Sequence, residues 1–217
     1  MADIIPFDSG PVQGLLHRPT NPLGDGVVLT HGAGADCRSP LLVAVANCLA
    51  DSGISVLRYD LPFRRTRPHG PPFPAGASRD REGLREAAHA MRSLVPSRLI
   101  LGGHSYGGRQ ASMLMAEDPT VADALLLLSY PLHPPKKLHD VRTGHFHALR
   151  RPAMFVHGTS DPFGTIEEIQ NALILIPGPT VLVPIEKAGH DLLKGRFEIV
   201  RLVIEPFKSM IENHRDS

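Results

Sequence analysis

Short apolar runs alternate with segments of helical spacing along most of this chain. The runs contain few polar residues, which is typical of strands covered on both faces. The segments between them repeat apolar residues every three or four positions, as helices packed on a sheet do. This alternation predicts an α/β fold, in which a mostly parallel central sheet carries helices on both faces. We expect strands at residues 12–17, 27–31, 54–59, 99–101, 124–128, 153–157 and 180–183.

The ends of these elements carry their own signals. We expect the strand at 12–17 to lie at the sheet edge. Ser39 is expected to cap a helix that has Pro40 at its first position and Gly53 as its stop signal. Further helices are expected over 84–95, between Ser105 and Pro119, over 165–176 and after His190. The last of these has Pro206 as a predicted kink and, on one face, Leu193, Phe197, Val200, Ile204, Phe207 and Ile211.

One pentapeptide ties this pattern to chemistry. Gly103-His104-Ser105-Tyr106-Gly107 has the form G-x-S-x-G and lies between an apolar strand and a helix. In that setting the motif is a nucleophile elbow, whose tight turn needs glycines and lifts the serine hydroxyl above the sheet edge. The turn also sets Ser105 at a helix N-terminus, where free N–H groups favour developing negative charge. The alternative is a Gly-rich turn with an incidental serine.

Two other strand ends carry the residues that such a serine needs. Asp161 follows the strand at 153–157 and His190 follows the strand at 180–183. A neutral histidine can take the serine proton, and an aspartate on its other ring nitrogen fixes the tautomer. Because the carboxyl ends of parallel strands share one edge, we expect Ser105, Asp161 and His190 to meet there. Alone, Asp161 could be a turn residue and His190 a surface histidine.

Other side chains fit these roles less well. The aspartates Asp36 and Asp60 follow strands earlier in the chain than Ser105, and His157 ends the strand that should deliver Asp161. We therefore interpret His157 as a core histidine. Three further histidines have no metal-ligand spacing, so we expect no metal and no cofactor: His133, His145 and His147.

The oxyanion of the transition state needs N–H donors. The Tyr106 amide, directly after the nucleophile, is the first candidate. The loop after the strand at 27–31 supplies the second, with Ala33 as first choice and Gly34 as second. The loop His31-Gly32-Ala33-Gly34 could also be only a Gly-rich turn.

Residues 60–77 break the alternation. Their prolines exclude a regular helix or an inner strand, so we expect a long connection. Since it leaves the carboxyl end of the strand at 54–59, it should fold over the pocket mouth as a rim that covers Phe63 and Phe73. Its arginines are either solvated, or Arg64 or Arg65 binds an anionic group of the substrate.

Length and composition limit the alternatives. The 217 residues are predicted to form one domain, residues 1–217, with a formal net charge of +1. We therefore expect neither nucleic acid nor a membrane as partner, and the oligomeric state is left open. The N-terminus lacks the pattern of a signal peptide. Cys37 and Cys48 form no disulfide framework, and both are expected to be structural or incidental in a protein of the reducing cytoplasm.

The sequence resembles the α/β-hydrolase superfamily along nearly its whole length, including the chain order of nucleophile, acid and base. Within it, the chain is similar to a dienelactone-hydrolase-like branch that includes testis-expressed and chromatin-complex-associated hydrolase-like proteins. True dienelactone hydrolases have a cysteine where this chain has Ser105. The resemblance rests on these motifs: residues 31–34, 59–64, 103–109, 130–134, 158–164 and 189–191.

These observations predict a serine hydrolase that cleaves a small carboxylic ester or thioester through an acyl-enzyme. No insertion is long enough for a helical cap, so an open, shallow pocket is expected. The alternative is a non-catalytic interaction module that retains the same fold. The resemblance names neither the acyl group nor the alcohol.

Overall fold

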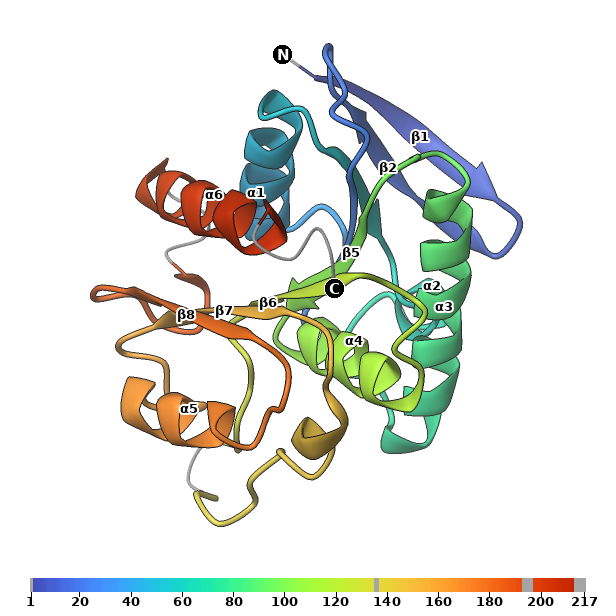
Figure 1. Cartoon of the computed structure of the whole chain (residues 1–217). Helices are drawn as coiled ribbons and strands as arrows, with labels where there is room; N and C mark the ends of the chain where they lie inside the picture. The colour runs from blue at the N-terminus through green and yellow to red at the C-terminus, as the bar shows by residue number, and fades with distance from the viewer. Residues whose placement is uncertain (1, 135–136, 193–196, 213–217) are drawn as a thin grey trace.

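A single eight-stranded sheet organises the chain, with strand order β1-β2-β4-β3-β5-β6-β7-β8 (Figure 1). The computed structural model describes residues 2–134, 137–192 and 197–212, without the side chains of 197–201, 211 and 212. β2 runs antiparallel to both of its neighbours, and all pairs from β4 to β8 are parallel. The strands are β1 (Asp3–Ser9), β2 (Val12–Arg18), β3 (Gly26–Thr30), β4 (Ser55–Tyr59), β5 (Leu99–His104), β6 (Ala124–Leu128), β7 (Ala153–Gly158) and β8 (Thr180–Ile185).

Helices cover both faces of the sheet, as predicted. α1 (Pro40–Asp51) and α6 (Phe197–Glu212) lie on one face (Figure 1). α3 (Ala77–Arg92), α4 (Tyr106–Glu117) and α5 (Ile166–Leu173) lie on the other. Each face has its own apolar core, so the inner strands β3 and β6 are buried along their whole length. The continuous apolar runs in the sequence follow from this two-sided cover.

The edge of the sheet differs from the prediction. β1 is the edge strand, and its seven residues pair with β2, so the placement of 12–17 at the edge was wrong. Most β1 side chains are exposed, which leaves no apolar pattern to indicate a strand. Pro6 at its centre also argues against an inner strand, but an edge strand has one side that needs no N–H donors.

Helix termini follow the sequence signals in part. Gly53 has φ +90°, a left-handed conformation that suits glycine at the end of α1. Ser39 stands at the N-cap position with Pro40 next, as predicted, but its side chain makes no capping hydrogen bond. Pro206 lies inside α6, and Ile204 and Phe207 are buried. Of the other predicted face residues, Leu193 lies outside the described residues, as do the side chains of Phe197, Val200 and Ile211.

The proline-rich segment contains more helix than predicted. α2 (Pro62–Thr66) forms a short α-helix, and residues Pro74–Gly76 form one 3₁₀ turn. Pro62 stands at the first helical position, where a backbone N–H would have no partner inside the helix, so proline is tolerated there. The prediction that this segment contains no regular helix was therefore wrong. Phe63 is buried as expected, but Phe73 remains 69% exposed.

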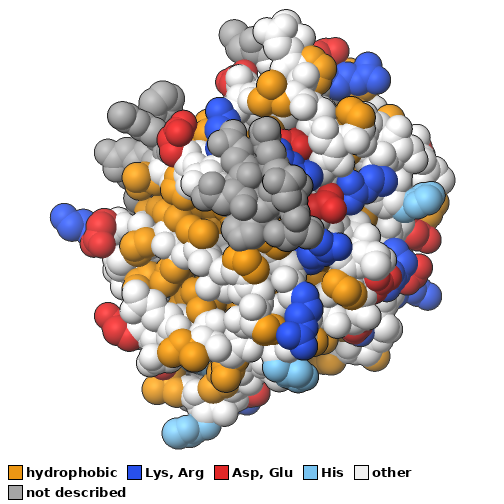
Figure 2. All heavy atoms as spheres, in the orientation of Figure 1, with side chains coloured by type: hydrophobic (Ala, Val, Ile, Leu, Met, Phe, Trp, Pro, Cys, Tyr) orange, Lys and Arg blue, Asp and Glu red, His pale blue; other side chains and the backbone are white. Residues whose placement is uncertain are grey.

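The surface carries mixed charge. On the face shown in Figure 2, basic and acidic side chains are interspersed. Within the described part of the chain, no helix is both long and apolar enough to cross a bilayer.

Candidate active site

Ser105 sits in a strained turn between β5 and α4. Its backbone has φ 51° and ψ −115°, a conformation that non-glycine residues rarely adopt. The turn is close to the neighbouring strand: a Cβ on Gly103 would lie 2.7 Å from the Thr30 carbonyl oxygen, and one on Gly107 would lie 2.6 Å from the His31 oxygen. The Ser105 N–H donates to the Leu128 carbonyl at 2.8 Å. These contacts fix the geometry of the elbow.

The three predicted side chains meet at the carboxyl edge of the sheet. The Ser105 hydroxyl lies 2.8 Å from Nε2 of His190. Nδ1 of the same ring lies 2.8 Å and 3.0 Å from the two carboxylate oxygens of Asp161. A carboxylate only accepts, so Nδ1 carries the proton and Nε2 is left to accept from the serine. In such an arrangement a histidine can take the serine proton while the carboxylate orients the ring.

Asp161 is built into the turn after β7. Its side chain is fully buried, and its Oδ1 also accepts from the Phe163 amide at 2.9 Å. His157 Nε2 lies 3.7 Å from Oδ2 and 2.8 Å from the Gly164 carbonyl, to which it donates. Burial lowers the pKa of His157, which is fully buried. It is therefore a neutral core residue behind the acid, as interpreted from the sequence.

Two residues that the sequence did not single out contact His190, one at its backbone carbonyl and one at its ring. Nε2–H of His104 donates to the His190 carbonyl at 2.8 Å, and burial lowers the pKa of His104 to about 4. The Phe163 ring packs on the His190 ring, with centroids 4.1 Å apart and planes inclined by 31°. Their only sequence signal is adjacency, because one directly precedes Ser105 and the other follows Asp161 by two positions.

The glycine-rich loop after β3 lies directly against the nucleophile. A Cβ on Gly32 would lie 3.5 Å from Cβ of Ser105. Residues 32–35 form a turn closed by the Ala35 N–H, which donates to the Gly32 carbonyl at 3.1 Å. The amides of Ala33, Gly34 and Tyr106 have no partner among the described residues. We call residues 32–35 the oxyanion-loop turn, since it carries the Ala33 and Gly34 amides, the two candidates for the second oxyanion donor.

The Arg64 guanidinium is turned to the backbone, which argues against its prediction as a substrate contact. Its buried guanidinium donates to four backbone carbonyls, those of Ala33, Ala35, Arg67 and Gly70, at 2.8–3.1 Å. Arg65 is exposed and donates to the Pro11 carbonyl in the turn between β1 and β2. Nothing in the structure tests whether Arg65 contacts a substrate, so that assignment stays a prediction.

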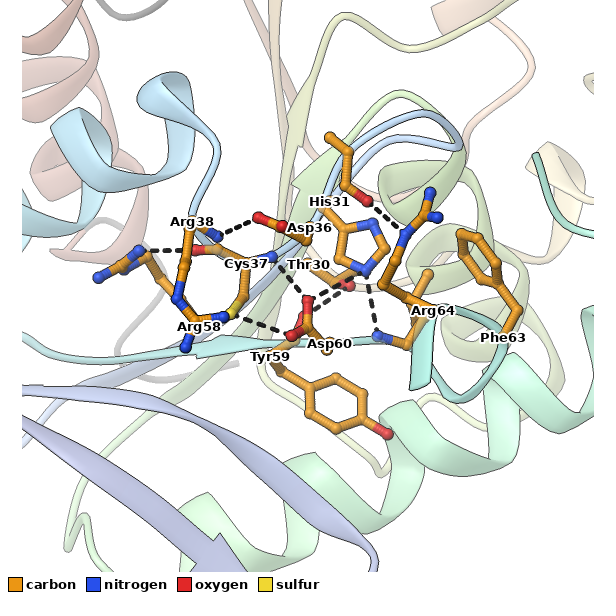
Figure 3. Close-up of polar contacts among 12 residues, drawn as sticks. Thr30, His31, Asp36, Cys37, Arg38, Arg58, Tyr59, Asp60, Phe63 and Arg64 are labelled. Atoms are coloured by element: carbon orange, nitrogen blue, oxygen red, sulfur yellow. Dashed lines mark hydrogen bonds and ion pairs between the residues drawn. The ribbon is translucent and has the colours of Figure 1, made fainter. Parts of the chain in front are cut away.

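His31, directly after β3, and Asp60, directly after β4, also hold this loop (Figure 3). His31 is fully buried, and burial lowers its pKa, so the ring is neutral. Its Nδ1–H donates to the Gly32 carbonyl at 2.9 Å, and its Nε2 accepts from the Leu61 amide at 3.2 Å. Asp60 accepts from the Cys37 amide at 2.7 Å and from the Cys37 thiol at 3.2 Å. Asp60 therefore anchors the loop and lies outside the Ser105–His190 pair.

The remaining candidates have separate surroundings. Asp36 accepts from the Arg38 amide at 2.7 Å. His133 lies 3.3 Å from Glu168, and His145 lies 2.8 Å from the Ser112 hydroxyl. Among the residues that the structure describes, no three histidine, cysteine or acidic side chains converge as a metal site.

Comparison with known proteins places this geometry in a family. Residues 24–198 match the alpha/beta hydrolase domain family. The chain belongs to that family. Among solved structures, an alpha-beta serine hydrolase homologue from Coxiella burnetii superposes with a TM-score of 0.74 at 14% identity, over 94% of this chain and 96% of that one. A dienelactone hydrolase from Anabaena variabilis gives 0.72 at 19%, over 98% and 97%.

A third structural neighbour is Est1E from Butyrivibrio proteoclasticus, with a TM-score of 0.71 at 15% identity, over 96% of this chain and 99% of that one. At such identities the neighbours establish the α/β-hydrolase fold, which confirms the predicted fold class. Membership of this family supports hydrolase activity for this chain.

Proposed function

We propose that this α/β-hydrolase is a serine hydrolase that cleaves a small carboxylic ester or thioester through an acyl-enzyme. The observation that carries the proposal is the hydrogen-bonded chain from the Ser105 hydroxyl through His190 to Asp161. A serine hydroxyl is a poor nucleophile unless a neighbouring base takes its proton. Here the base is within hydrogen-bond distance, and a buried carboxylate orients it.

In the proposed first step, Ser105 Oγ attacks the substrate carbonyl while Nε2 of His190 takes the hydroxyl proton. The resulting oxyanion accepts from the Tyr106 N–H and from a second donor in the oxyanion-loop turn, the Ala33 N–H or the Gly34 N–H. The imidazolium then gives its proton to the leaving alcohol or thiol, and Ser105 remains acylated. Asp161 stays ionised throughout and stabilises the imidazolium.

Water completes the proposed cycle. His190 takes a proton from the water that attacks the acyl-enzyme, and returns it to Ser105 Oγ as the carboxylic acid leaves. No redox step or cofactor is required. Residues 129–152 connect β6 to β7, and in their described part the only helical piece is the turn Phe146–Ala148. This segment therefore provides no helical cap, which supports the proposal of a small substrate.

Two finer assignments belong to the same proposal. One is kinship with the dienelactone-hydrolase-like branch, with Ser105 in place of its cysteine. The other is location in the cytoplasm. The kinship rests on the sequence motifs, and the location rests on the two free cysteines.

A fluorophosphonate probe tests the proposal. The probe phosphonylates only an activated serine, so wild-type protein should be labelled and Ser105→Ala protein should not. Ser129→Ala is a matched control, because Ser129 also has a positive φ, of 48°, but is fully buried after β6. Unlabelled, folded wild-type protein would refute the proposal and favour the non-catalytic interaction module.

A further inference from the structure

Arg64 is a buried cation with no carboxylate partner among the described side chains. It is 8% exposed, and within the described residues every hydrogen bond of its guanidinium goes to a backbone carbonyl. Burying a charge is costly unless it is paired or fully hydrogen-bonded. Four of its five N–H groups have carbonyl partners, so the charge is compensated by peptide dipoles that the guanidinium holds in fixed positions.

Two of these partners lie in the oxyanion-loop turn. Nη2 donates to the Ala33 carbonyl and Nε to the Ala35 carbonyl, each at 2.8 Å. Because a peptide unit is planar and trans, the carbonyl of one residue and the N–H of the next point in opposite directions. Holding the Ala33 carbonyl therefore also fixes the direction of the Gly34 N–H.

The preceding peptide is held from a different side. Its carbonyl, on Gly32, accepts from Nδ1–H of His31 at 2.9 Å and from the Ala35 N–H at 3.1 Å. That peptide carries the Ala33 N–H. The two candidate donor peptides are consecutive and share the Cα of Ala33, so a shift of the Ala33 carbonyl also changes the angle between them.

The other two partners lie in the proline-rich segment, after α2. Nη1 donates to the Arg67 carbonyl at 2.9 Å and Nη2 to the Gly70 carbonyl at 3.1 Å. One guanidinium thus joins residues 67–70 to the oxyanion-loop turn. In Figure 3, the Arg64 side chain extends from α2 toward the loop that carries His31 and Cys37.

We propose that Arg64 is a positioning residue for the oxyanion hole, holding the oxyanion-loop turn in register with Ser105 and coupling it to residues 67–70 of the proline-rich segment. This inference rests on the proposed function. Arg64 touches no substrate in this account; it acts through the Ala33–Gly34 peptide. Misplaced oxyanion donors weaken binding of the transition state more than binding of the substrate.

A lysine should not replace this arginine. The guanidinium is a rigid planar fork with five donors, and it spans carbonyls on two separate segments. An ammonium offers three donors from one point at the end of a flexible stem. Arg64→Lys keeps the charge and the bulk, so it separates the fork geometry from charge alone.

The test compares Arg64→Lys and Arg64→Met with Arg65→Met, whose arginine is exposed on the same short helix. For each protein, fluorophosphonate titration gives the fraction of active sites, and kcat and KM are measured with p-nitrophenyl acetate. We expect kcat per active site to fall about 10- to 100-fold in both Arg64 variants. This is less than the roughly 10²–10³-fold loss on deleting an oxyanion donor. KM should change little, and Arg65→Met should match wild type.

An aryl trifluoromethyl ketone separates positioning from general damage, because it forms a tetrahedral adduct with an active serine. Its inhibition constant should rise in the Arg64 variants by about the factor lost in kcat/KM. Partial unfolding would lower the active fraction and leave the inhibition constant of the remaining sites unchanged, and that result would overturn the positioning role. So would wild-type kcat in Arg64→Met. In either case, ester hydrolysis by the wild-type protein would leave the proposed function intact. A wild-type protein that hydrolyses no ester would refute the proposed function and the positioning role together.

Discussion

Replacing Asp161 by asparagine should nearly abolish activity without unfolding the protein, because the surroundings fix how the new amide is oriented. Oδ1 of Asp161 accepts from the Phe163 N–H at 2.9 Å. The amide oxygen must occupy that position, since an NH₂ group there would face another donor. The amide nitrogen then falls at the Oδ2 position, 2.8 Å from Nδ1 of His190.

This orientation should invert the tautomer of His190. The NH₂ group takes the nearer position, 2.8 Å from Nδ1, and the amide oxygen the farther one, at 3.0 Å. The nearer contact favours Nδ1 as an acceptor, with the ring proton on Nε2. Nε2 then has no lone pair to take the Ser105 proton. A wrong-tautomer substitution of this kind lowers kcat about 10⁴-fold in a serine protease triad, which corresponds to roughly 5 kcal/mol of lost transition-state stabilisation.

The fold should be much less affected. The amide has the shape of the carboxylate and keeps the Phe163 hydrogen bond, so we expect the free energy of unfolding to change by no more than about 2 kcal/mol. The assay is p-nitrophenyl acetate hydrolysis, with urea unfolding on the same samples and Asp191→Asn as the control. Activity of Asp161→Asn within tenfold of wild type, in folded protein, would refute the tautomer argument.

Further predictions concern other contacts of the site. Burial lowers the pKa of His104 to about 4 in the folded protein, whereas a histidine in the unfolded chain has a pKa of about 6.5. The unfolded state therefore binds more protons below pH 6.5, and the free energy of unfolding falls as the pH drops toward 4. In urea unfolding, His104→Gln, which keeps an N–H donor, should lessen the loss between pH 6.5 and 4.5 by about 2 kcal/mol; an unchanged pH profile would contradict this. Burial raises the pKa of Cys37 to about 12, so Cys37→Ser should keep most ester hydrolysis and the native thiol should resist iodoacetamide at pH 8; complete inactivation would overturn that view. His190→Ala should be nearly as damaging to kcat as Ser105→Ala, since the two act as a unit, and turnover near the wild-type rate would exclude His190 as the base.

The sequence predicted those parts of the structure that depend on local pattern and chain order. Apolar runs marked the inner strands because both of their faces are buried. Ser105, Asp161 and His190 could be chosen because parallel strands bring their carboxyl ends to one edge. The left-handed Gly53 was equally readable, since a helix end of this kind needs a residue that tolerates positive φ.

What failed depends on contacts that a local pattern does not encode. β1 is held by pairing with β2 and buries little, so its residues carry no periodic signal. The direction of the Arg64 side chain depends on carbonyls 31 and 29 positions away, at Ala33 and Ala35. An arginine in a proline-rich segment looks the same whether it binds a substrate, water or the backbone behind an oxyanion loop.

The most direct test of the central claim is to trap the acyl-enzyme. Wild-type protein is mixed with p-nitrophenyl acetate, quenched in acid during turnover, digested and examined by mass spectrometry. We expect one acetyl group on the peptide that contains Ser105, its absence in Ser105→Ala, and its accumulation under conditions that slow deacylation. Ester turnover by the wild-type protein with no acetyl group on Ser105 at any quench time, or an equal rate in Ser105→Ala, would contradict this expectation.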